Sequence, residues 1–443
     1  MPIGAREAAL KSLAAFRKSG AWSNTQLNNI IVAEGLSRRD AALATHLCYG
    51  VLQNMLLCDY YISFFSTVKP SKMEPLVLDI LRLGVYQIVF LTKIPHSAAV
   101  NEAVLLTKKY SNKRASGLVN AVLRKISANA DHLPDISTDR KEEYLSIKYS
   151  HPLWFVEYFI DHIGYDDTEK LLKANNQPVP TYIQINYLKT PPADLEKEPS
   201  NDYNRLVHHQ WLSGCFELTG QGSIESFEPF VQGHIYIQDP AARLSVIAAG
   251  VRPGDFVIDA CAAPGGKSFA AAIEMRNEGR ILSCDIHESK LQHITGGSER
   301  LGIKIIETRA QDARILSEDL LESADCVIAD VPCSGFGVIR KKPEIRYKDK
   351  NEITALPAIQ LDILKNLSKY VKPGGCLLYS TCTLLKSENE DIISDFLAGK
   401  DLFVLEAFDL PEPVETAATG MITLWPHIHG TDGFFICKLR RRE

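Results

Sequence analysis

The sequence predicts a multidomain protein: an all-α bundle at the N-terminus, a small mixed α+β segment, and a C-terminal α/β domain with a mostly parallel sheet. Three observations predict this fold class. The chain has 443 residues, whereas one domain usually holds roughly 100–200. Apolar residues recur at helical spacing before residue 135. Short apolar runs alternate with longer helical segments after residue 236.

Residues 1–135 form the predicted helical domain. In PLVLDILRLGVYQIVFL, which begins at Pro75, apolar residues recur at steps of three, one and four, as in an amphipathic helix. Residues 1–130 carry 16 Lys and Arg against 7 Asp and Glu, although the whole chain has a net charge of −5. A basic module on an acidic body suggests a polyanion partner. The alternative is that these are solvated helix faces that happen to be basic.

Residues 136–235 form a predicted linker and mixed α+β segment. SANADHLPDISTDRKEEY is polar and contains a proline, so it reads as a linker. We expect a helix after Pro152 and a strand in TYIQINYL, which begins at Thr181 and alternates polar with apolar residues. TPPADLEKEPS, from Thr190, is a predicted loop.

Residues 236–443 alternate in the way that βαβ units do, which predicts a mostly parallel sheet covered by helices on both faces. Its expected strands lie in DFVIDACAA, RILSCDIH, IKIIETRA, ADCVIADVP, GGCLLYSTCT and GFFICKL.

The ten cysteines form no CxxC pair and none lies near His at zinc-like spacing. We therefore expect reduced thiols in a cytoplasmic protein, without a structural metal. Most of them, such as Cys48, Cys284 and Cys437, lie in apolar runs and are interpreted as small core residues. No signal peptide and no membrane-spanning run is evident, and no oligomeric partner is either.

A small-residue turn follows the first strand of the C-terminal domain, in DACAAPGGKS, Asp259–Ser268. Glycines here let a ligand approach the backbone, and the free N–H groups of the next helix point toward it. The turn matches neither GxGxxG nor GxxxxGK[ST], which disfavours a dinucleotide or P-loop site. Asp285 after the second strand is placed to accept from ribose hydroxyls, and Asp312 after the third to reach an adenine amino group. Alternatively, each aspartate merely caps a helix.

Two further strands each end in a cysteine, Cys333 in DVPCSG and Cys382 in YSTCT. Taken singly, either could be a buried strand-end residue. Asp330 stands three residues before Cys333.

Together, DACAAPGGKS, DVPCSGFG and YSTCT resemble the RNA cytosine-5 methyltransferase family, also called the RsmB/NOP family. GHIYIQDPAARL resembles the segment that precedes the cofactor loop in this family, and ILRLGVYQIVFLTKIPHSAAVNEAV and GLVNAVLRKI resemble the NusB-like RNA-binding domain. The resemblance covers nearly the whole chain. It implies a Rossmann-like class I methyltransferase domain and S-adenosylmethionine as methyl donor. The implied donor contacts are Cys261, Ala262, Ala263, Pro264, Gly265, Gly266, Lys267, Asp285, Asp312 and Asp330.

The resemblance also implies catalytic roles. Cytosine carbon 5 is a poor nucleophile until a thiolate adds to carbon 6, which is covalent catalysis. By resemblance, Cys382 is that nucleophile and Cys333 assists breakdown of the adduct. Asp330 would donate to ring nitrogen 3 or accept from the exocyclic amine, and Lys267 would favour the thiolate. The family usually reads Thr-Cys-Ser at the nucleophile, whereas Thr383 keeps only the hydroxyl of that serine.

RKKPEIRYKDK, from Arg340, is the predicted phosphate-binding segment near Cys333. Its expected phosphate contacts are Arg340, Lys341, Lys342, Arg346 and Lys348. Tyr347 would stack on a base. Interspersed acids leave open a simple solvated loop.

The resulting functional prediction is methyl transfer from S-adenosylmethionine to carbon 5 of a specific cytosine in 16S rRNA, or in a small-subunit assembly intermediate. Two alternatives are a tRNA cytosine-5 methyltransferase and a non-catalytic RNA-binding or ribosome assembly factor.

Overall fold

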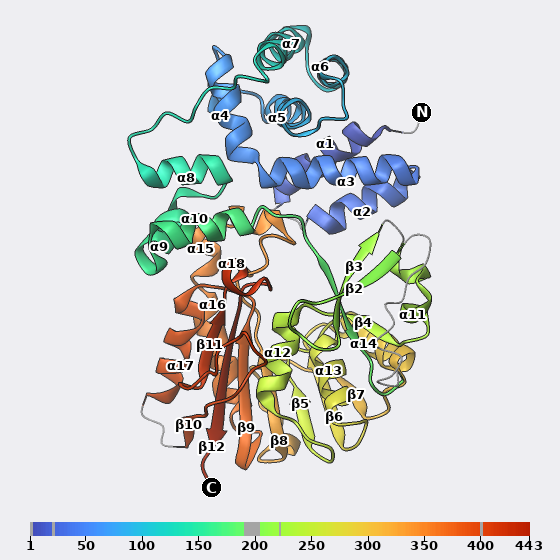
Figure 1. Cartoon of the computed structure of the whole chain (residues 1–443), viewed down its shortest axis with the longest axis vertical. Coiled ribbons are helices and arrows are strands. Elements are labelled where there is room, and N and C mark those ends of the chain that lie inside the picture. The colour runs from blue at the N-terminus through green and yellow to red at the C-terminus, as the bar shows by residue number, and fades with distance from the viewer. Residues whose placement is uncertain (1–2, 20–22, 190–203, 221–222, 399–401) are drawn as a thin grey trace. The chain divides into compact units, whose positions relative to one another are not determined.

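The computed structural model describes residues 3–19, 23–189, 204–220, 223–398 and 402–443 (Figure 1). The chain divides into two compact units. The first unit comprises Met1–Gln177 with Lys341–Lys348, and the second comprises Pro178–Arg340 with Asp349–Glu443. The predicted domain boundaries at residues 135 and 235 stay predictions.

The described part of the first unit is helical, which confirms the predicted all-α N-terminus. Pro75 occupies the first turn of α5, where its missing N–H costs nothing, and Asn112 caps α7 by accepting from the backbone N–H of Ala115 at 3.0 Å. Pro152 precedes α9, as expected. The helices are α1 Ala5–Ser19, α2 Ser23–Ala33, α3 Arg38–Gln53, α4 Met55–Phe65, α5 Pro75–Phe90, α6 His96–Tyr110, α7 Lys113–Ala128, α8 Lys141–Tyr149, α9 Leu153–Ile163 and α10 Tyr165–Ala174.

A four-stranded antiparallel sheet opens the second unit, in the order β2-β3-β1-β4. The expected strand in TYIQINYL is β1. The predicted loop TPPADLEKEPS lies outside the described residues. The elements here are β1 Thr181–Ile185, β2 Asn204–His208, β3 Cys215–Gly220, α11 Glu228–Val231 and β4 Ile235–Ile237.

The larger sheet has eight strands in the order β10-β12-β9-β8-β5-β6-β7, with β11 paired to β12. Strands β5 to β9 pair in parallel, and β12 runs antiparallel to β9, so the sheet is mixed but mostly parallel. All six expected strands are present. The strands are β5 Phe256–Asp259, β6 Arg280–Asp285, β7 Ile306–Ala310, β8 Ala324–Asp330, β9 Val371–Thr381, β10 Phe403–Leu405, β11 Met421–Leu424 and β12 Phe434–Arg441.

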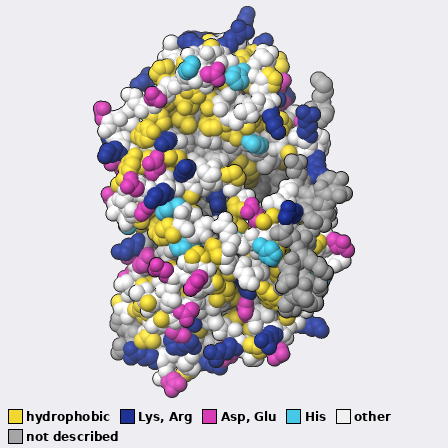
Figure 2. Space-filling model, viewed as in Figure 1, with side chains coloured by type: hydrophobic (Ala, Val, Ile, Leu, Met, Phe, Trp, Pro, Cys, Tyr) yellow, Lys and Arg dark blue, Asp and Glu magenta, His cyan; other side chains and the backbone are white. Residues whose placement is uncertain are grey.

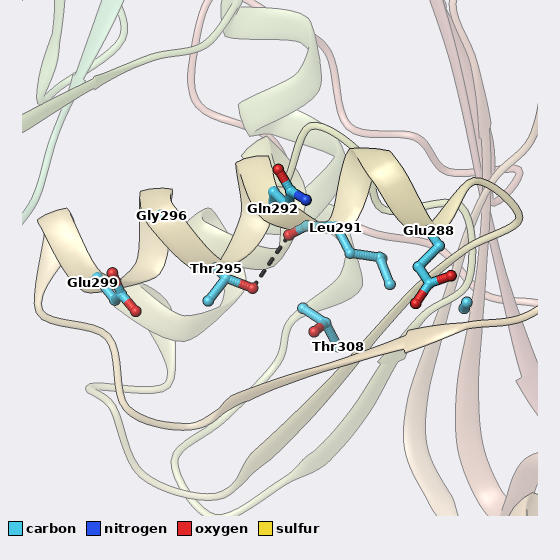
Figure 3. Close-up of a pocket in the computed structure, with 8 residues that line it drawn as sticks. Glu288, Leu291, Gln292, Thr295, Gly296, Glu299 and Thr308 are labelled. Atoms are coloured by element: carbon cyan, nitrogen blue, oxygen red, sulfur yellow. Dashed lines mark hydrogen bonds between the residues drawn. The ribbon is translucent and has the colours of Figure 1, made fainter.

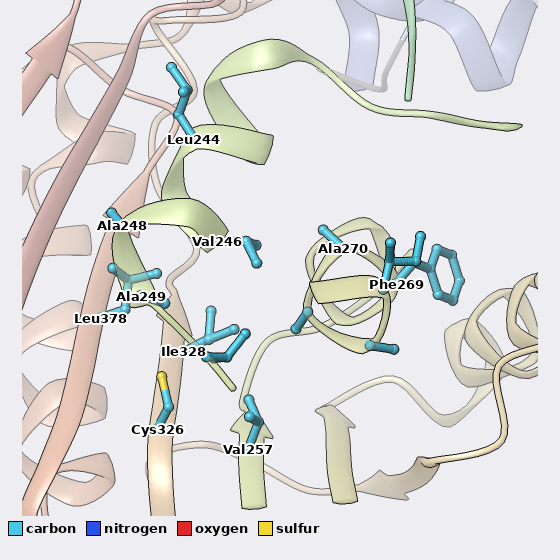
Figure 4. Packing of buried hydrophobic residues seen from close by; sticks show 14 of the residues in the cluster. Leu244, Val246, Ala248, Ala249, Val257, Phe269, Ala270, Cys326, Ile328 and Leu378 are labelled. Carbon is cyan, nitrogen blue, oxygen red and sulfur yellow. The ribbon is translucent and has the colours of Figure 1, made fainter. Parts of the chain in front are cut away.

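Helices cover both faces of this sheet because successive side chains of a strand point to opposite faces. In β8, Ile328 packs on the side of α12, α13 and α14 (Figure 4), whereas its neighbour Val327 packs on the side of α16 and α17. The covering helices are α12 Pro240–Ala249, α13 Gly266–Glu274, α14 Glu288–Leu301, α16 Leu356–Leu367 and α17 Glu390–Leu397; two short helices are α15 Lys350–Ile353 and α18 Pro426–His429. This layering leaves the carboxyl ends of the parallel strands as the place for a site.

Candidate active site

The turn after β5 is shaped by a glycine that no other residue could easily replace. Gly265 is the N-cap of α13 and has a φ of +111°. A Cβ at this position would lie 2.6 Å from the ring of Phe269. The turn is anchored from below, where the Ser268 hydroxyl donates to Asp259 at 2.6 Å. The backbone N–H groups of the first turn of α13 are therefore presented at the crevice, which suits a nucleoside donor with a charged tail.

The two acidic residues predicted to contact a nucleoside have different surroundings. Asp285 is buried at the end of β6 and accepts from the backbone N–H of His287 at 2.9 Å. Asp312 accepts from the backbone of Arg314 and from its guanidinium, the latter at 2.6 Å. The guanidinium lowers the pKa of Asp312. Both aspartates thus make the local hydrogen bonds that a helix-capping residue would make. Their contacts with a donor stay predictions.

Lys267 and Asp330 form an ion pair at the carboxyl ends of β5 and β8. The Lys267 ammonium donates to Asp330 at 2.6 Å, and the Ser380 hydroxyl donates to the other carboxylate oxygen at 2.9 Å. Burial acts to lower the pKa of Lys267, but the charge and hydrogen bond of Asp330 outweigh it and raise that pKa. Lys267 is therefore a buried cation at the carboxyl edge of the sheet. Ser380 was not singled out from the sequence, although its position just before the cysteine of YSTCT was the available signal.

The two cysteines meet because β8 and β9 are parallel neighbours. The sulfurs of Cys333 and Cys382 lie 3.4 Å apart, and both residues are partly exposed. Their mutual hydrogen bond lowers the pKa of Cys382 and raises that of Cys333. Burial and Asp330 oppose the change at Cys382, whereas Lys267 reinforces it. Of the two thiols, Cys382 is therefore the one that loses its proton more easily.

Cys261 in the cofactor turn has no such activation. Burial is the main cause that raises its pKa, and the carboxylates of Asp259 and Asp330 add to it. Its thiol is therefore a neutral group in the turn, suited to contact and not to attack. With Ala262, Ala263 and Pro264 it forms the wall of the turn ahead of Gly265.

The predicted phosphate-binding segment needs a correction. Arg346 is fully buried in the first unit and donates to the backbone carbonyls of Gln53, Tyr149 and Ser150 at 3.0–3.3 Å. The Tyr347 hydroxyl donates to the carbonyl of Leu52 at 2.8 Å. Arg346 therefore cannot contact phosphates, and Tyr347 does not stand ready to stack on a base. In the sequence, Arg346 is only one member of a basic run. Its hydrogen bonds to carbonyls at helix ends could not be predicted from that pattern.

A groove of about 620 Å³ lies between α14 and β7, away from the cysteines (Figure 3). Glu288, Thr295 and Thr308 are among its lining residues. None of the predicted catalytic or donor-binding residues lines it. The chemistry is therefore assigned to the strand ends and not to this groove.

Three further observations concern surface charge, metal ligands and membrane-spanning helices. On the face drawn in Figure 2, Lys and Arg side chains are dispersed among other types and not gathered into one patch. Within the described ranges, no group of His, Cys, Asp or Glu side chains is arranged to hold a metal ion. Among the helices described, none is by itself long and apolar enough to cross a membrane; α3 and α4 pass such a test on length and composition only as a pair bent by 77°.

Comparison with known proteins identifies the parts. The sequence matches the profile of the 16S rRNA methyltransferase RsmB/F over residues 246–440. It matches the NusB family over residues 4–128 and an RsmF/B-like ferredoxin-like domain over residues 151–225.

Full-length relatives carry the same combination. The probable ribosomal RNA small subunit methyltransferase B of Bacillus subtilis (strain 168) is 36% identical, covering 99% of this chain and 98% of its own. The protein of the same description from Synechocystis sp. is 31% identical and covers 99% and 100%. The crystal structure of PH0851 superposes with a TM-score of 0.80 at 26% identity, covering 99% and 98%. The chain therefore belongs to the RsmB/F family of rRNA methyltransferases, which act on RNA with S-adenosylmethionine as the methyl donor.

Proposed function

We propose that this protein methylates carbon 5 of a cytosine in 16S rRNA through a covalent bond between Cys382 and carbon 6. The observation that carries the proposal is the pair of sulfurs 3.4 Å apart, partly exposed beside the Lys267–Asp330 ion pair. A transferase acting on a nitrogen or on ribose oxygen has no use for two thiols held in contact, one of them with a lowered pKa. Attack on a pyrimidine ring does need one, because carbon 5 has to be made nucleophilic first.

The first step is addition of the Cys382 thiolate to carbon 6. A sulfur–carbon bond forms, the carbon 5–carbon 6 double bond opens, and electron density moves to carbon 5 and toward ring nitrogen 3. The Lys267–Asp330 pair supports this step, since Lys267 lowers the pKa of Cys382. Asp330 is the group we propose to face the polar edge of the ring.

When bound, S-adenosylmethionine would supply the methyl group for carbon 5; its sulfur–methyl bond would break and S-adenosylhomocysteine would be the leaving group. A base from the surrounding water must then take the carbon 5 proton. The electron pair left behind restores the carbon 5–carbon 6 double bond as the carbon–sulfur bond to Cys382 breaks. We assign assistance in this elimination to Cys333, which faces Cys382. As Cys382 departs it regains its electron pair, and the Cys333 thiol can stabilise that thiolate by a hydrogen bond.

We propose that the donor lies against the turn after β5 and the two acidic positions that follow β6 and β7. The turn shape at Gly265 and the burial of Asp285 support this placement. The proposed contacts are Cys261, Ala262, Ala263, Pro264, Gly265, Gly266, Lys267, Asp285, Asp312 and Asp330.

The target base must be unpaired or flipped out of its helix, because a thiol cannot reach carbon 6 within a stack; flipping costs a few kcal/mol. Small-subunit RNA is the proposed substrate, supported by the descriptions of the relatives and by the NusB match in the basic first unit. The cytoplasm is the proposed compartment, because all ten cysteines are free thiols.

The test is transfer of a labelled methyl group to unmethylated 16S rRNA, with a tRNA pool as the comparison and bisulfite sequencing to locate the product. We expect label in 16S rRNA at a single cytosine. Label in tRNA alone would show that tRNA is the substrate. Label on adenine or ribose would contradict the covalent cysteine mechanism. Normal donor binding by calorimetry with no transfer to any RNA would favour the non-catalytic alternative.

A further inference from the structure

We propose that Glu388 and Asn389 are positioning residues that hold the loops of Cys333 and Cys382 in contact. The inference rests on the proposed function for its meaning, but its geometry does not depend on any substrate. Both residues are buried, at 1% exposure; Glu388 ends the 3₁₀ turn Lys386–Glu388, and Asn389 is the residue before α17. Neither belongs to the motifs that pointed to the chemistry.

Asn389 clamps the end of the nucleophile strand. Its amide oxygen accepts from the Thr381 hydroxyl at 2.6 Å, and its amide nitrogen donates to the Thr383 carbonyl at 3.1 Å. These two residues flank Cys382. Asn389 is also the N-cap residue of α17, yet its side chain makes no capping hydrogen bond to that helix. Asparagine is among the best capping residues, so the side chain forgoes its usual local bond to bridge both neighbours of the cysteine.

Glu388 holds the other loop. Its carboxylate accepts from the backbone N–H of Ser334, the residue after Cys333, at 2.9 Å. The same carboxylate oxygen accepts from the amide of Gln360 on α16 at 2.8 Å, and this amide also donates to the carbonyl of Pro332 at 3.0 Å. Both neighbours of Cys333 are therefore fixed through Glu388 and Gln360. The Tyr379 hydroxyl donates to the Glu388 carbonyl at 2.6 Å and ties the arrangement to β9.

The two loops are also stitched directly to each other. The hydroxyls of Ser334 and Thr383 lie 2.7 Å apart, and the backbone N–H of Gly337 donates to the Cys382 carbonyl at 2.9 Å. The residue after each cysteine is thus bonded to the other, inside the protein. Glu388 and Asn389 are consecutive residues, and together they hold both loops. The distance between the two sulfurs is therefore set by this buried hydrogen-bond network and not by the sulfurs themselves.

Such a network matters because a catalytic group displaced by about 1 Å can cost about 100-fold in rate. The thiol of Cys333 lowers the pKa of Cys382 only while it is within hydrogen-bond reach. Loosening either loop should therefore affect the attacking thiolate as well as the later elimination.

The first experiment needs no RNA. It measures the rate at which iodoacetamide alkylates Cys382 as a function of pH, by peptide mass spectrometry. The groups that face Cys382 are Cys333, Asp330, Lys267 and Asp432. In N389A and E388A we expect the midpoint of the profile to move up by about one pH unit, because the bond from Cys333 is weakened. E388Q keeps the acceptor for Ser334 and should restore the original midpoint.

The matched control is E390A. Glu390 is the next residue, and it accepts a hydrogen bond from the Thr423 hydroxyl, which lies outside both cysteine loops. Its profile should equal that of the unaltered protein. An unchanged midpoint in both N389A and E388A, with unchanged thermal stability, overturns the proposal whatever the enzyme methylates.

The second experiment uses 16S rRNA and the methyl-transfer assay. N389A should lower kcat about 100-fold with little change in KM, whereas E390A and E388Q should retain most of their turnover. If the unaltered protein shows no transfer, the proposed function fails and the alkylation result still stands. If N389A and E388A do not fold, T383V replaces them, since it removes only the hydroxyl that bonds to Ser334. T383S should behave like the parent, and a parental profile in T383V would then count against the inference.

Discussion

Two pairs of cysteines belong to β8 and β9: one pair follows the carboxyl ends of the strands, and the other lies within them. Cys333 and Cys382 follow the carboxyl ends, and Cys326 and Cys376 are partners in the register of the same two strands. In each pair a hydrogen bond between the thiols lowers the pKa of the β9 cysteine and raises that of the β8 cysteine. Lys438 contributes to the lowering at Cys376 as Lys267 does at Cys382. By electrostatics the two pairs are nearly equivalent.

The two cysteine pairs differ in their exposure to solvent. Cys326 and Cys376 are 2% and 3% exposed, and both belong to one packed core; Figure 4 shows Cys326 within it. Their cation, Lys438, is engaged by Glu406 at 3.3 Å. Cys333 and Cys382 (the upper pair) are partly exposed, at the end of the sheet where α/β folds bind ligands, whereas Cys326 and Cys376 (the lower pair) are buried. A close pair of polarised thiols is therefore not sufficient to define a reaction centre; the open end of the strands is also required.

The largest difference between the two pairs is expected when the β9 cysteine of each pair is removed. C382A should lower methyl transfer by about 10⁴-fold or more, because the covalent route is lost. C376A should keep most of its turnover, since that sulfur lies in the core. Single-turnover transfer to 16S rRNA measures both. Comparable losses in the two variants would mean that the lower pair takes part in the reaction.

Removal of the β8 cysteines tests the assigned roles. C333A should accumulate a covalent protein–RNA complex that survives heating in detergent, because adduct formation remains while elimination is slowed. C326A should release its product as the unaltered enzyme does. Detection is by the shifted band on a denaturing gel. A stable complex formed by C382A instead would reverse the roles of the two upper cysteines.

A smaller effect is expected from the cations. Lys267 favours the Cys382 thiolate, so K267M should raise the pKa of Cys382 and move the acidic limb of its alkylation profile to higher pH, by about one unit. K438M should leave that profile unchanged, because Lys438 acts on Cys376. Alkylation rates between pH 5 and 9 would show this. A downward shift in K267M would contradict the assigned electrostatics.

The smallest expected effect is on the free energy of unfolding, and here Cys326 and Cys376 matter more than Cys382. C326A and C376A should each lower the free energy of unfolding by about 1 kcal/mol, because a well-packed buried atom is lost. C382A should change it less, since its side chain is partly exposed. Urea unfolding followed by circular dichroism gives the comparison. Equal losses at 376 and 382 would show that the upper pair is packed as tightly as the lower.

Much of this architecture could be predicted from local pattern. Six of the eight strands of the large sheet followed from short apolar runs, and α5 and α9 from their periodicity and prolines. Cys333 and Cys382 could be assigned to one site because the family resemblance implies neighbouring strands, and parallel strands end at one edge of the sheet. These are properties that neighbouring residues or a regular topology determine.

The rest depended on tertiary context that the sequence does not display. Arg346 looks like a surface cation in a basic run, but it is buried against carbonyls about 200 to 300 residues away in the chain. Glu388 and Asn389 look like the start of an ordinary helix, and their role is visible only through contacts with Ser334 and Thr383. Cys326 and Cys376 could not be recognised as a pair before the strand register was known.

The burial of Arg346 in the first unit has a consequence for dissecting the protein. Residues 341–348 belong to the first unit while the chain on either side belongs to the second, so the backbone passes between the two units three times. One proteolytic cut after Gln177 would therefore not release the helical unit. A recombinant fragment ending there would also lack the guanidinium that bonds to the carbonyls of Gln53 and Ser150. Supplying Lys341–Lys348 as a separate peptide would be the direct remedy, in the manner of a complementing fragment.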